Sequence, residues 1–378
     1  MFIAQYRRWS LLAAAALMPS ITAAQPRPQD SISTSFLTRP LRIPMREAGP
    51  DGLEALLVQP NEPGAHPLVV LTHGRPATAL ERSEMTPQRL LPEAVEFARR
   101  GWATAIIMRR GYGTSGGRYA ESILSCEYPN YQPQAREPAK DLQAAISYLS
   151  TLPEVDARRI VAVGASAGGL AATALTADPP PGLVAAVNFA GGSGHAGPNE
   201  ICQPGGLLSM FWLLGKKSRV PMLWVYAEND TFFNPEIAES MYQEFTKAGG
   251  KATFIAAPPF GTEGHSLFSP SGIPVWTRYV DDFLMGQGLV LRSDLLPLPT
   301  PPHVGPPRGL TPTGKKAFQD YLILPGEKAF AVDPGRTWGY EYGRRTREEA
   351  KKAALQHCER GGSQGCRVVI LNNSSASE

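Results

Sequence analysis

One stretch of small residues behind an apolar segment restricts the fold of this chain more than any other feature. Residues 160–163 read Ile-Val-Ala-Val, and such an apolar, β-branched run predicts a strand covered on both faces of a sheet. Gly164-Ala-Ser166-Ala-Gly168 follows directly, and the small and apolar residues after it suit a helix. Because glycines two residues before and after Ser166 let strand and helix approach closely, the stretch predicts a sharp turn that exposes the Ser166 hydroxyl.

Segments typical of strands and helices alternate along the chain on both sides of this turn. An antiparallel edge is predicted first, at residues 41–45 and 53–59, because Gly and Pro separate two strand-like runs. The alternation then predicts strands at 67–72, 102–108, 160–163, 183–189, 220–227 and 252–257, with helices at 86–101, 139–152, 235–247 and 275–285. For the first helix a restart at Pro92 stays open. This order is typical of an α/β fold with a mostly parallel, doubly wound sheet.

Changes in composition divide the chain into four parts. Residues 1–24 have the pattern of a secretory signal peptide, and residues 25–288 contain the alternating strands and helices. Residues 289–313 form a predicted semi-rigid linker, because seven prolines between positions 290 and 312 exclude regular helix and interior strand. Residues 314–378 remain as a small α+β module at the C-terminus.

The first 24 residues predict export to the periplasm or the extracellular space, with no stable membrane anchor. Arg7 and Arg8 precede the apolar run 11–18, which is shorter than the roughly 20 residues that span a bilayer, and the segment ends at Ala24. The residues around the arginines fit twin-arginine export poorly, so the ordinary secretory route is preferred. Removing these residues lowers the formal charge from +3 to +1, which gives no support for nucleic acid as a partner.

The C-terminal module is predicted to have a ββαβ order. Residues 328–332, 337–342 and 366–371 are typical of short strands. A capping box at Thr346-Arg-Glu-Glu349 predicts the start of a helix that ends near residue 358. A module of about 60 residues buries only a small core, so a disulfide is an expected source of stability.

Four cysteines in an exported chain favour disulfides. They are Cys126, Cys202, Cys358 and Cys366, and three pairings are possible. We favour Cys126 with Cys202 and Cys358 with Cys366, because each bond then lies within one domain. No C-x-x-C or H-E-x-x-H spacing occurs in the sequence, so no metal is expected.

A serine hydroxyl is a weak nucleophile at neutral pH, and it requires a base, an acid that orients the base, and donors for an oxyanion. In a parallel sheet these groups are expected after the carboxyl ends of strands. Asp230 follows the strand at 220–227, and His265 follows the strand at 252–257. The sequence therefore predicts Ser166 as nucleophile, His265 as base and Asp230 as orienting acid. Two alternatives stay open: Glu228 as the acid, and Asp230 as a helix cap.

The remaining histidines are placed less favourably. His66 precedes a strand, His303 lies in the linker and His357 lies in the module. His73 follows a strand but adjoins the loop expected to bind the oxyanion. His195 follows Gly191-Gly-Ser-Gly in another loop at a strand end, and we retain it as the reserve base or as a residue that faces the substrate.

Two backbone N–H groups are predicted to hold the oxyanion. One belongs to Ala167, directly after the nucleophile, at the N-terminus of the helix. The other comes from the loop after the strand at 67–72, where Arg75 is the best candidate. The Arg75 side chain either reaches a substrate carboxylate or is simply solvated.

Gly111-Tyr-Gly113-Thr-Ser-Gly116 matches the G-x-G-x-x-G pattern of dinucleotide-binding loops. Gly, Cys and Pro interrupt residues 117–129, so the helix that such a site needs is not expected, and no nucleotide cofactor is predicted. We interpret the glycines as a tight turn behind Ser166. Residues 117–136 are expected to form a loop over the pocket, held by a bond from Cys126 to Cys202. The apolar residues 205–214 either line an acyl pocket or pack in the core, and we favour the core.

These motifs together resemble those of the α/β-hydrolases, and within them the dienelactone hydrolase and prolyl-oligopeptidase-like branch. The resemblance covers roughly residues 50–288 and rests on His73-Gly74, Arg110-Gly-Tyr-Gly113, Gly164-Ala-Ser166, Asp230 and Gly264-His265. Dienelactone hydrolases have a cysteine nucleophile, so Ser166 argues against dienelactone as the substrate and for an ordinary serine esterase. The C-terminal stretch resembles a small secreted bacterial module and carries no candidate catalytic group.

The resemblance implies an exported serine hydrolase that cleaves a carboxylic ester through an acyl-enzyme, with no metal or organic cofactor. Two alternatives stay open. One is a serine peptidase or amidase that uses the same residues, and the other is a non-catalytic envelope scaffold whose module binds a partner. The expected partners are a small-molecule ester or short peptide at the pocket and, for the module, a component of the cell envelope.

Overall fold

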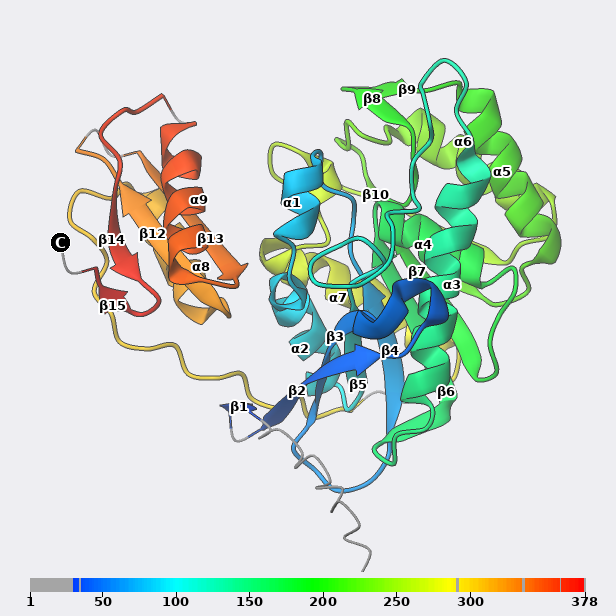
Figure 1. Ribbon diagram of the computed structural model, residues 1–378, viewed down its shortest axis with the longest axis horizontal. Helices are drawn as coiled ribbons and strands as arrows, with labels where there is room; N and C mark the ends of the chain where they lie inside the picture. The colour runs from blue at the N-terminus through cyan, green and yellow to red at the C-terminus, as the bar shows by residue number, and fades with distance from the viewer. Residues whose placement is uncertain (1–29, 34, 290–291, 335–336, 361, 377–378) are drawn as a thin grey trace, which may run out of the picture.

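The computed structural model describes residues 30–33, 35–289, 292–334, 337–360 and 362–376. The signal peptide predicted at residues 1–24 lies outside this part of the chain. Figure 1 shows a large domain built around a central sheet, and a smaller C-terminal module that lies beside it and is joined to it by an extended segment.

The large domain is organised around a sheet of nine strands among the described residues, in the order β1-β2-β3-β5-β4-β6-β7-β10-β11. The strands are β1 (Asp30–Ser33), β2 (Phe36–Ile43), β3 (Leu53–Pro60), β4 (His66–Thr72), β5 (Ala103–Ile107), β6 (Val155–Ala165), β7 (Leu183–Phe189), β10 (Met222–Ala227) and β11 (Ala252–Ala257). Neighbours from β5 to β11 run parallel, whereas β1, β2 and β3 add an antiparallel edge. The predicted α/β sheet is confirmed.

Helices cover both faces of this sheet. One face carries α2 (Leu91–Arg99) and α7 (Ile273–Gly286), and the other carries α3 (Tyr131–Leu149), α4 (Ala167–Leu175), α5 (Pro204–Lys217) and α6 (Pro235–Lys247). The central strands supply apolar side chains to both cores: in β4, Val70 faces the second set of helices, while Val69 and Leu71 face the first. Strands that are apolar on both faces are thus buried on both, and the doubly wound arrangement is confirmed.

The helix predicted from residue 139 begins eight residues earlier, at Tyr131. Asn130 caps it by accepting a hydrogen bond from the N–H of Gln132 at 3.2 Å. Pro133 falls in the first turn, where a missing N–H costs no helical hydrogen bond, although the sequence alone makes it look like a helix breaker. The loop predicted at 117–136 therefore ends at Asn130.

The helix predicted at residues 86–101 is divided in the structure. A 3₁₀ helix, η2 (Pro87–Leu90), precedes α2, and an additional short helix, α1 (Ala79–Ser83), was not predicted. Thr78 and Glu81 cap α1 reciprocally: Thr78 Oγ1 accepts from the N–H of Glu81 at 3.1 Å, and Glu81 Oε2 accepts from the N–H of Thr78 at 2.9 Å. Residues from this segment line the same cavity as Ser166.

The proline-rich segment ends at Thr311, close to the predicted end of the linker at residue 313. Residues 292–311 contain neither helix nor strand, but an unpredicted helix, α8 (Pro312–Ile323), follows them. Thr311 caps this helix by accepting from the N–H of Gly314 at 3.1 Å. Pro312 occupies the first helical position, where its missing N–H has no partner to lose, so the proline opens the helix and does not prevent it.

The C-terminal module contains a four-stranded antiparallel sheet in the order β13-β12-β14-β15. Its elements are β12 (Glu327–Val332), β13 (Trp338–Arg344), α9 (Arg347–Glu359), β14 (Arg367–Leu371) and β15 (Ser374–Ser375). The predicted ββαβ order is present, with α8 and β15 added. The capping box expected at 346–349 is half formed, because the Glu349 carboxylate accepts from the N–H of Arg345 at 3.1 Å instead of that of Thr346.

Ion pairs attach this module to the large domain. They are Arg345 with Glu54 (2.7 Å), Arg89 with Glu341 (2.8 Å) and Arg344 with Glu84 (3.0 Å). Thr86 also donates a hydrogen bond from its hydroxyl to the carbonyl of Gly343, and Thr86 is only 2% exposed. Since both members of each pair are at most half exposed, the module is docked against the segment that carries α1, η2 and α2 and is not merely tethered by the linker.

Both disulfides join the cysteines in the pairing that the sequence favours, Cys126 with Cys202 and Cys358 with Cys366. Disulfides are typical of proteins in oxidising compartments, so this finding is compatible with export. Across the described segments, no helix combines the length and the apolar character needed to cross a lipid bilayer.

Candidate active site

Ser166 lies at a strained turn between β6 and α4. Its backbone has φ 56° and ψ −123°, a conformation that residues other than glycine adopt at a cost of about 1–3 kcal/mol. The turn is possible because Gly164 and Gly168 approach closely: a Cβ atom on Gly164 would lie 2.0 Å from the carbonyl oxygen of Gly168. The predicted strand, turn and helix are therefore all present, and the Ser166 side chain lines a cavity.

The two residues expected to hold an oxyanion flank Ser166. Ala167 occupies the first position of α4, where backbone N–H groups have no acceptor within the helix. On the other side, the loop after β4 passes so close that a Cβ on Gly74 would lie 3.2 Å from Cβ and 3.7 Å from Oγ of Ser166. Arg75 follows Gly74 and also lines the cavity. The structure therefore brings both backbone segments to the serine, as such a site requires.

Asp230 and His265 form a hydrogen-bonded pair. Oδ2 of Asp230 lies 3.0 Å from Nδ1 of His265, and Asp230 is only 1% exposed. The alternative acid, Glu228, is exposed and forms no hydrogen bond with His265 within the described chain. The alternative role of Asp230 as a helix cap is taken by Asn234, whose side chain accepts from the N–H of Ile237 at 3.1 Å. The geometry thus favours Asp230 as the partner of the imidazole.

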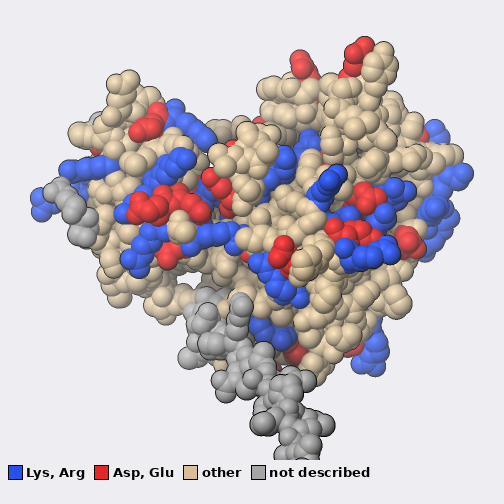
Figure 2. Space-filling view, viewed as in Figure 1, with Lys and Arg blue, Asp and Glu red and all other residues tan. Residues whose placement is uncertain are grey.

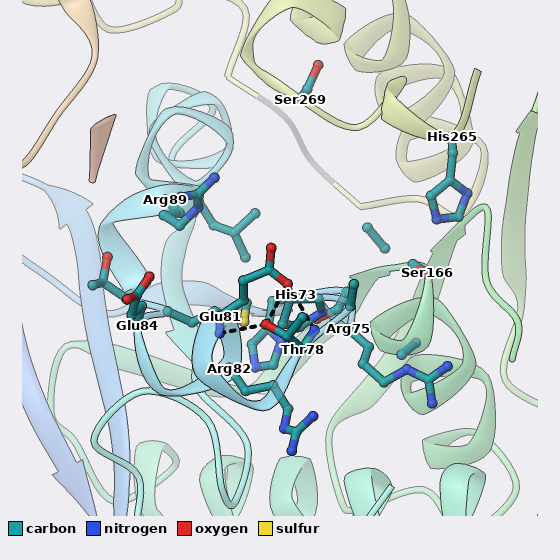
Figure 3. Close-up of a pocket in the computed structure, with 18 of the residues that line it drawn as sticks. His73, Arg75, Thr78, Glu81, Arg82, Glu84, Arg89, Ser166, His265 and Ser269 are labelled. Atoms are coloured by element: carbon teal, nitrogen blue, oxygen red, sulfur yellow. Dashed lines mark hydrogen bonds between the residues drawn. The ribbon is translucent and has the colours of Figure 1, made fainter. Parts of the chain in front are cut away.

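His265 lies in the 3₁₀ helix η3 (Gly264–Ser266), and its ring points toward Ser166 in the close-up of the cavity (Figure 3). The ring stacks on that of Phe232, with centroids 4.3 Å apart and planes 12° apart. Ser166, His265 and Asp230 come from the ends of β6, β11 and β10, so the three candidate residues meet at the carboxyl edge of the parallel strands. The sheet topology itself produces this meeting.

Glu263 was not singled out in the sequence, yet it links the two loops that carry Asp230 and His265. Its Oε1 accepts from the N–H of Thr231 and from the N–H of His265, both at 3.0 Å, and its Oε2 accepts from the Thr231 hydroxyl. Burial alone would raise the pKa of Glu263, but the bonds from Thr231 and His265 outweigh it and lower the pKa. An acid two residues before the candidate base is the only sequence signal for this role.

Two other histidines adjoin the site without replacing His265. His73 is buried, and its pKa is well below the ordinary value because burial and the nearby Arg109 disfavour the imidazolium. Its Nε2 accepts from the N–H of Arg109 at 3.2 Å, and Nδ1 lies 2.7 Å from the carbonyl of Gly74. Neutral His73 with the proton on Nδ1 satisfies both contacts, so it supports the loop and is not free to act as a base.

His195, the reserve base, faces the cavity from the hairpin β8 (His195–Gly197) and β9 (Glu200–Ile201). Its ring stacks on Phe232 at 4.0 Å, so Phe232 lies next to both imidazoles. Burial and the neighbouring His265 lower the pKa of His195, which keeps it neutral at pH 7. No carboxylate orients the His195 ring in the described chain. Of its two predicted roles, reserve base and substrate-facing residue, the second is therefore favoured.

A fully buried ion pair supports the loop behind Gly74. The Arg109 guanidinium donates to both carboxylate oxygens of Glu121, at 2.6 and 3.0 Å. It also donates to Oγ1 of Thr72 at 2.8 Å and to the carbonyl of His73 at 2.6 Å. Because Thr72 ends β4 and His73 begins the loop, Arg109 fixes the backbone that leads to the expected oxyanion donor.

The glycine-rich stretch 111–116 is not a phosphate-binding loop in this structure. No helix begins between it and Asn130, so the N-terminus that would hold a phosphate is absent from this described segment. Instead, sterics explain the glycine at position 116, because a Cβ there would lie 1.9 Å from the carbonyl oxygen of Ala48. The predicted turn behind Ser166 is wrong in detail: Gly111 packs against Tyr119, Gly113 against Glu54 and Met85, and Gly116 against Ala48 and Asp51, so none of the three packs against the serine.

The cavity over Ser166 has a volume of about 1330 Å³. Tyr119, Glu121 and Gln134 line it from the region around the Cys126–Cys202 bond, so part of the loop expected over the pocket does reach it. Residues 205–214 do not line the cavity; Leu207, Met210 and Phe211 of α5 pack in the core, as the sequence favours. The described residues contain no cluster of His, Cys, Asp or Glu that could hold a metal ion.

Comparison with known families decides the fold family of the large domain. Residues 118–274, which include Ser166, Asp230 and His265, match the model of the dienelactone hydrolase family. The large domain belongs to the α/β-hydrolase superfamily. This confirms the resemblance inferred from the motifs. The family that the large domain, hereafter the α/β-hydrolase domain, matches is a family of hydrolases. Residues 328–377, the larger part of the module, match a separate domain family of unknown function.

Solved structures similar to this chain are remote in sequence. One is described as a putative dienelactone hydrolase from Klebsiella pneumoniae, with 16% identity, a TM-score of 0.48, and coverage of 65% of this chain and 98% of that chain. An esterase from Thermogutta terrifontis has 17% identity, a TM-score of 0.46, and coverage of 67% and 95%. An acylaminoacyl peptidase has 16% identity and a TM-score of 0.48, and the match covers 66% of this chain but 41% of that chain. No curated protein matches the sequence.

Proposed function

We propose that the α/β-hydrolase domain is an exported serine hydrolase that cleaves a carboxylic ester through an acyl-enzyme. The observation that carries the proposal is the Asp230–His265 pair, 3.0 Å apart, on loops that meet beside Ser166 at its strained turn. A buried carboxylate that binds Nδ1 leaves Nε2 of the imidazole as the proton acceptor. A serine beside such an imidazole can be activated at neutral pH.

In the proposed reaction, Oγ of Ser166 attacks the ester carbonyl while Nε2 of His265 removes the hydroxyl proton. The carbonyl oxygen becomes an oxyanion, and the N–H groups of Ala167 and Arg75 stabilise it. The C–O bond to the alcohol then breaks, and the alcohol leaves with the proton from His265. A water molecule next attacks the acyl-Ser166 ester with His265 again as base, which releases the carboxylic acid and free Ser166. The protein and water supply every group that these steps need.

Ester cleavage is preferred to the peptidase alternative because the family matched at residues 118–274 is named for ester-like lactone hydrolysis. The same three residues serve amide cleavage equally well, so the leaving-group preference requires a direct comparison. Turnover of a 4-nitrophenyl ester and of alanine and proline 4-nitroanilides by the same preparation separates the two. Faster cleavage of the anilides would reverse our assignment.

Export rests on residues 1–24 of the sequence and is supported by the two disulfides. Expression of the full chain in a bacterium, followed by fractionation and N-terminal sequencing, tests it. We expect a mature protein that begins at residue 25 in the periplasm or medium. A full-length protein in the cytoplasm with free thiols would contradict export.

The experiment that tests the proposed chemistry is labelling of the mature protein with a fluorophosphonate, which reacts with activated serines. Mass spectrometry should place the adduct on Ser166, and the adduct should be absent from Ser166→Ala and from His265→Ala. Ser269→Ala should keep the adduct and serves as the control, because Ser269 lines the same cavity but its hydroxyl has no imidazole partner in the described chain. A folded wild-type protein without an adduct would instead favour the non-catalytic scaffold.

A further inference from the structure

The cavity that contains Ser166 continues past the α/β-hydrolase domain to the C-terminal module. Thr346, Lys352, Gln356 and Arg360, all on or beside α9, line its far part. Its volume of about 1330 Å³ exceeds the roughly 300–1,000 Å³ of most sites for small ligands. Figure 3 shows Glu81, Arg82, Glu84 and Arg89 along the segment that leads from Ser166 toward the module. One continuous space therefore has a wall from each domain.

The module's wall is held in a fixed position. Arg345 binds both oxygens of Glu54, at 2.8 and 2.7 Å, and it also donates to the carbonyl of Met85 at 2.8 Å. The hydroxyl of Tyr342 donates to the carbonyl of Arg89 at 3.2 Å. These contacts lie immediately before α9 and anchor its N-terminal end, which fixes the position of this helix beside the cavity.

The carboxylates that line this cavity are already engaged. Four are paired with cations: Glu84 with Arg344, Glu121 with Arg109, Glu341 with Arg89 and Glu348 with Lys351. Two accept N–H groups at the start of helices, since Glu81 binds the N–H of Thr78 and Glu349 that of Arg345. Glu93 is buried, which raises its pKa to about 8 and keeps it protonated at neutral pH.

Several cations on the same walls lack such a partner. Within the described chain, the side chains of Lys352 and Arg360 form no hydrogen bond or ion pair, and Arg82 is stacked on the ring of Tyr119 at 4.1 Å without a carboxylate. Arg360 does act across the cavity on Glu81, whose pKa is lowered first by the Thr78 hydrogen bonds and further by this guanidinium. Lys352 and Arg360 thus face the cavity without a direct ion-pair partner in the described chain, while Figure 2 shows acidic and basic side chains intermingled over the face of the molecule in view.

We propose that the module is a substrate-binding wall, and that Lys352 and Arg360 bind an anionic group of an elongated ester whose reacting carbonyl lies at Ser166. The inference rests on the proposed function for the position of the ester group. The ligand class is an ester with a carboxylate or a comparable anion at a distance from the bond that is cleaved. A guanidinium and an ammonium that face a cavity without a hydrogen-bonded counter-ion recognise such a group by charge-assisted hydrogen bonds.

The test is a binding measurement on full-length, disulfide-bonded Ser166→Ala, which holds an ester without cleaving it. Two series of esters of increasing length are titrated by calorimetry. In one the carboxylate ends the acyl arm, as in 4-nitrophenyl hemiesters of dicarboxylic acids; in the other it ends the alcohol arm, as in acetate esters of ω-hydroxy acids. Each compound is matched by its uncharged amide. We expect one series to bind about fivefold to tenfold more tightly than its amides, and this advantage to shrink at high ionic strength.

Variants assign the effect to the module. In the background of Ser166→Ala, the double change Lys352→Ala/Arg360→Ala should abolish the advantage of the charged esters and leave the amides unchanged. Lys352→Arg should retain it. Arg347→Ala is the matched control, because Arg347 lies on α9 but pairs with Glu327, and neither of the two lines the cavity. All these side chains are at least partly exposed, so the variants are expected to fold.

Equal affinity for charged and uncharged esters in both series would overturn the proposal. An advantage that survives in Lys352→Ala/Arg360→Ala would also overturn it, because the anion would then be bound elsewhere. Failure of the proposed function is seen separately, as a wild-type protein that turns over neither series and takes up no fluorophosphonate. The binding result stands or falls independently of that outcome.

Discussion

The carboxylate of Asp230 lies 3.0 Å from Nδ1 of His265, and the backbone holds the same carboxylate from its other side. Oδ1 accepts from the N–H groups of Phe232 and Phe233 at 2.8 and 2.9 Å, while Oδ2 faces the imidazole. With Oδ1 engaged, the side chain cannot rotate without losing two hydrogen bonds. His265 is consequently presented in one orientation before any substrate arrives.

Asp230→Asn should lower kcat for an aryl ester by about 10³–10⁴-fold, because an amide in this position stabilises the wrong imidazole tautomer. Glu228→Gln is the matched control, since Glu228 is two residues away, exposed and without a hydrogen bond to His265 in the described chain. Steady-state kinetics with melting temperatures of both variants check the prediction. Comparable losses in the two variants would reassign the acid.

Glu263→Ala should lower kcat by about tenfold to a hundredfold with little change in KM. The change releases the N–H groups of Thr231 and His265, so the base loses its position while the binding surface is retained. Glu263→Gln keeps an oxygen that can accept both bonds and should restore most of kcat. A parallel rise in KM, or no recovery with Gln, would mean that Glu263 contacts substrate or acts on stability alone.

Arg109→Met should lower the free energy of unfolding by about 3–5 kcal/mol, because it leaves the Glu121 carboxylate buried without its cation. The double variant Arg109→Met/Glu121→Gln removes that charge as well and should recover part of the loss. Denaturant unfolding of the wild type, the two single variants and the double variant measures both effects. If the double variant is as unstable as the sum of the single changes, the buried charge is not the cause.

The two disulfides should differ in what they contribute to stability. The Cys126–Cys202 bond closes a span of 76 residues, and the Cys358–Cys366 bond closes a span of 8. Constraint of the unfolded chain predicts a loss of about 4.5 kcal/mol for the pair of Cys-to-Ser changes at 126 and 202, and about 2.5 kcal/mol for those at 358 and 366. Denaturant titrations of the two double variants decide the order. A larger loss for the second bond would contradict the entropic explanation.

Glu93 should make the protein less stable as the pH rises. Burial raises its pKa from 4.5 to about 8, so between these values the unfolded chain releases a proton that the folded protein retains. Stability therefore falls as pH increases through this window, by about 3 kcal/mol at pH 7. Glu93→Gln cannot ionise and should show a flatter profile of melting temperature against pH from 5 to 8. Identical profiles would show that Glu93 ionises normally.

Much of the fold could be predicted because Gly, Pro and helix-capping residues mark the ends of its helices and strands. The ranges predicted at 183–189, 235–247 and 252–257 coincide with β7, α6 and β11. Asn234 and Pro235 mark the start of α6, and glycines follow its end. Prolines were wrongly interpreted as helix breakers where they occur inside or at the start of a helix. The first turns of α3 and all of α8 were therefore missed.

The candidate triad could be found because a parallel sheet brings successive strand ends together, whatever the loops do. The contacts that support these three residues could not be predicted from the sequence. Arg109 meets Glu121 through an irregular segment, and Glu263 meets Thr231 across 32 residues of chain. The module docks by pairs such as Arg345 with Glu54, which are 291 residues apart. Contacts of this kind depend on side-chain geometry that no local pattern encodes.

The glycines around Ser166 report on backbone crowding and not on reactivity. A methyl group on Gly164 would collide with the backbone of Gly168 whether or not position 166 carries a hydroxyl. A descendant of this protein that had lost its nucleophile would therefore still need both glycines in order to fold. The G-x-x-x-G spacing indicates the fold. Only the imidazole and carboxylate opposite it distinguish an active hydrolase from an inactive one.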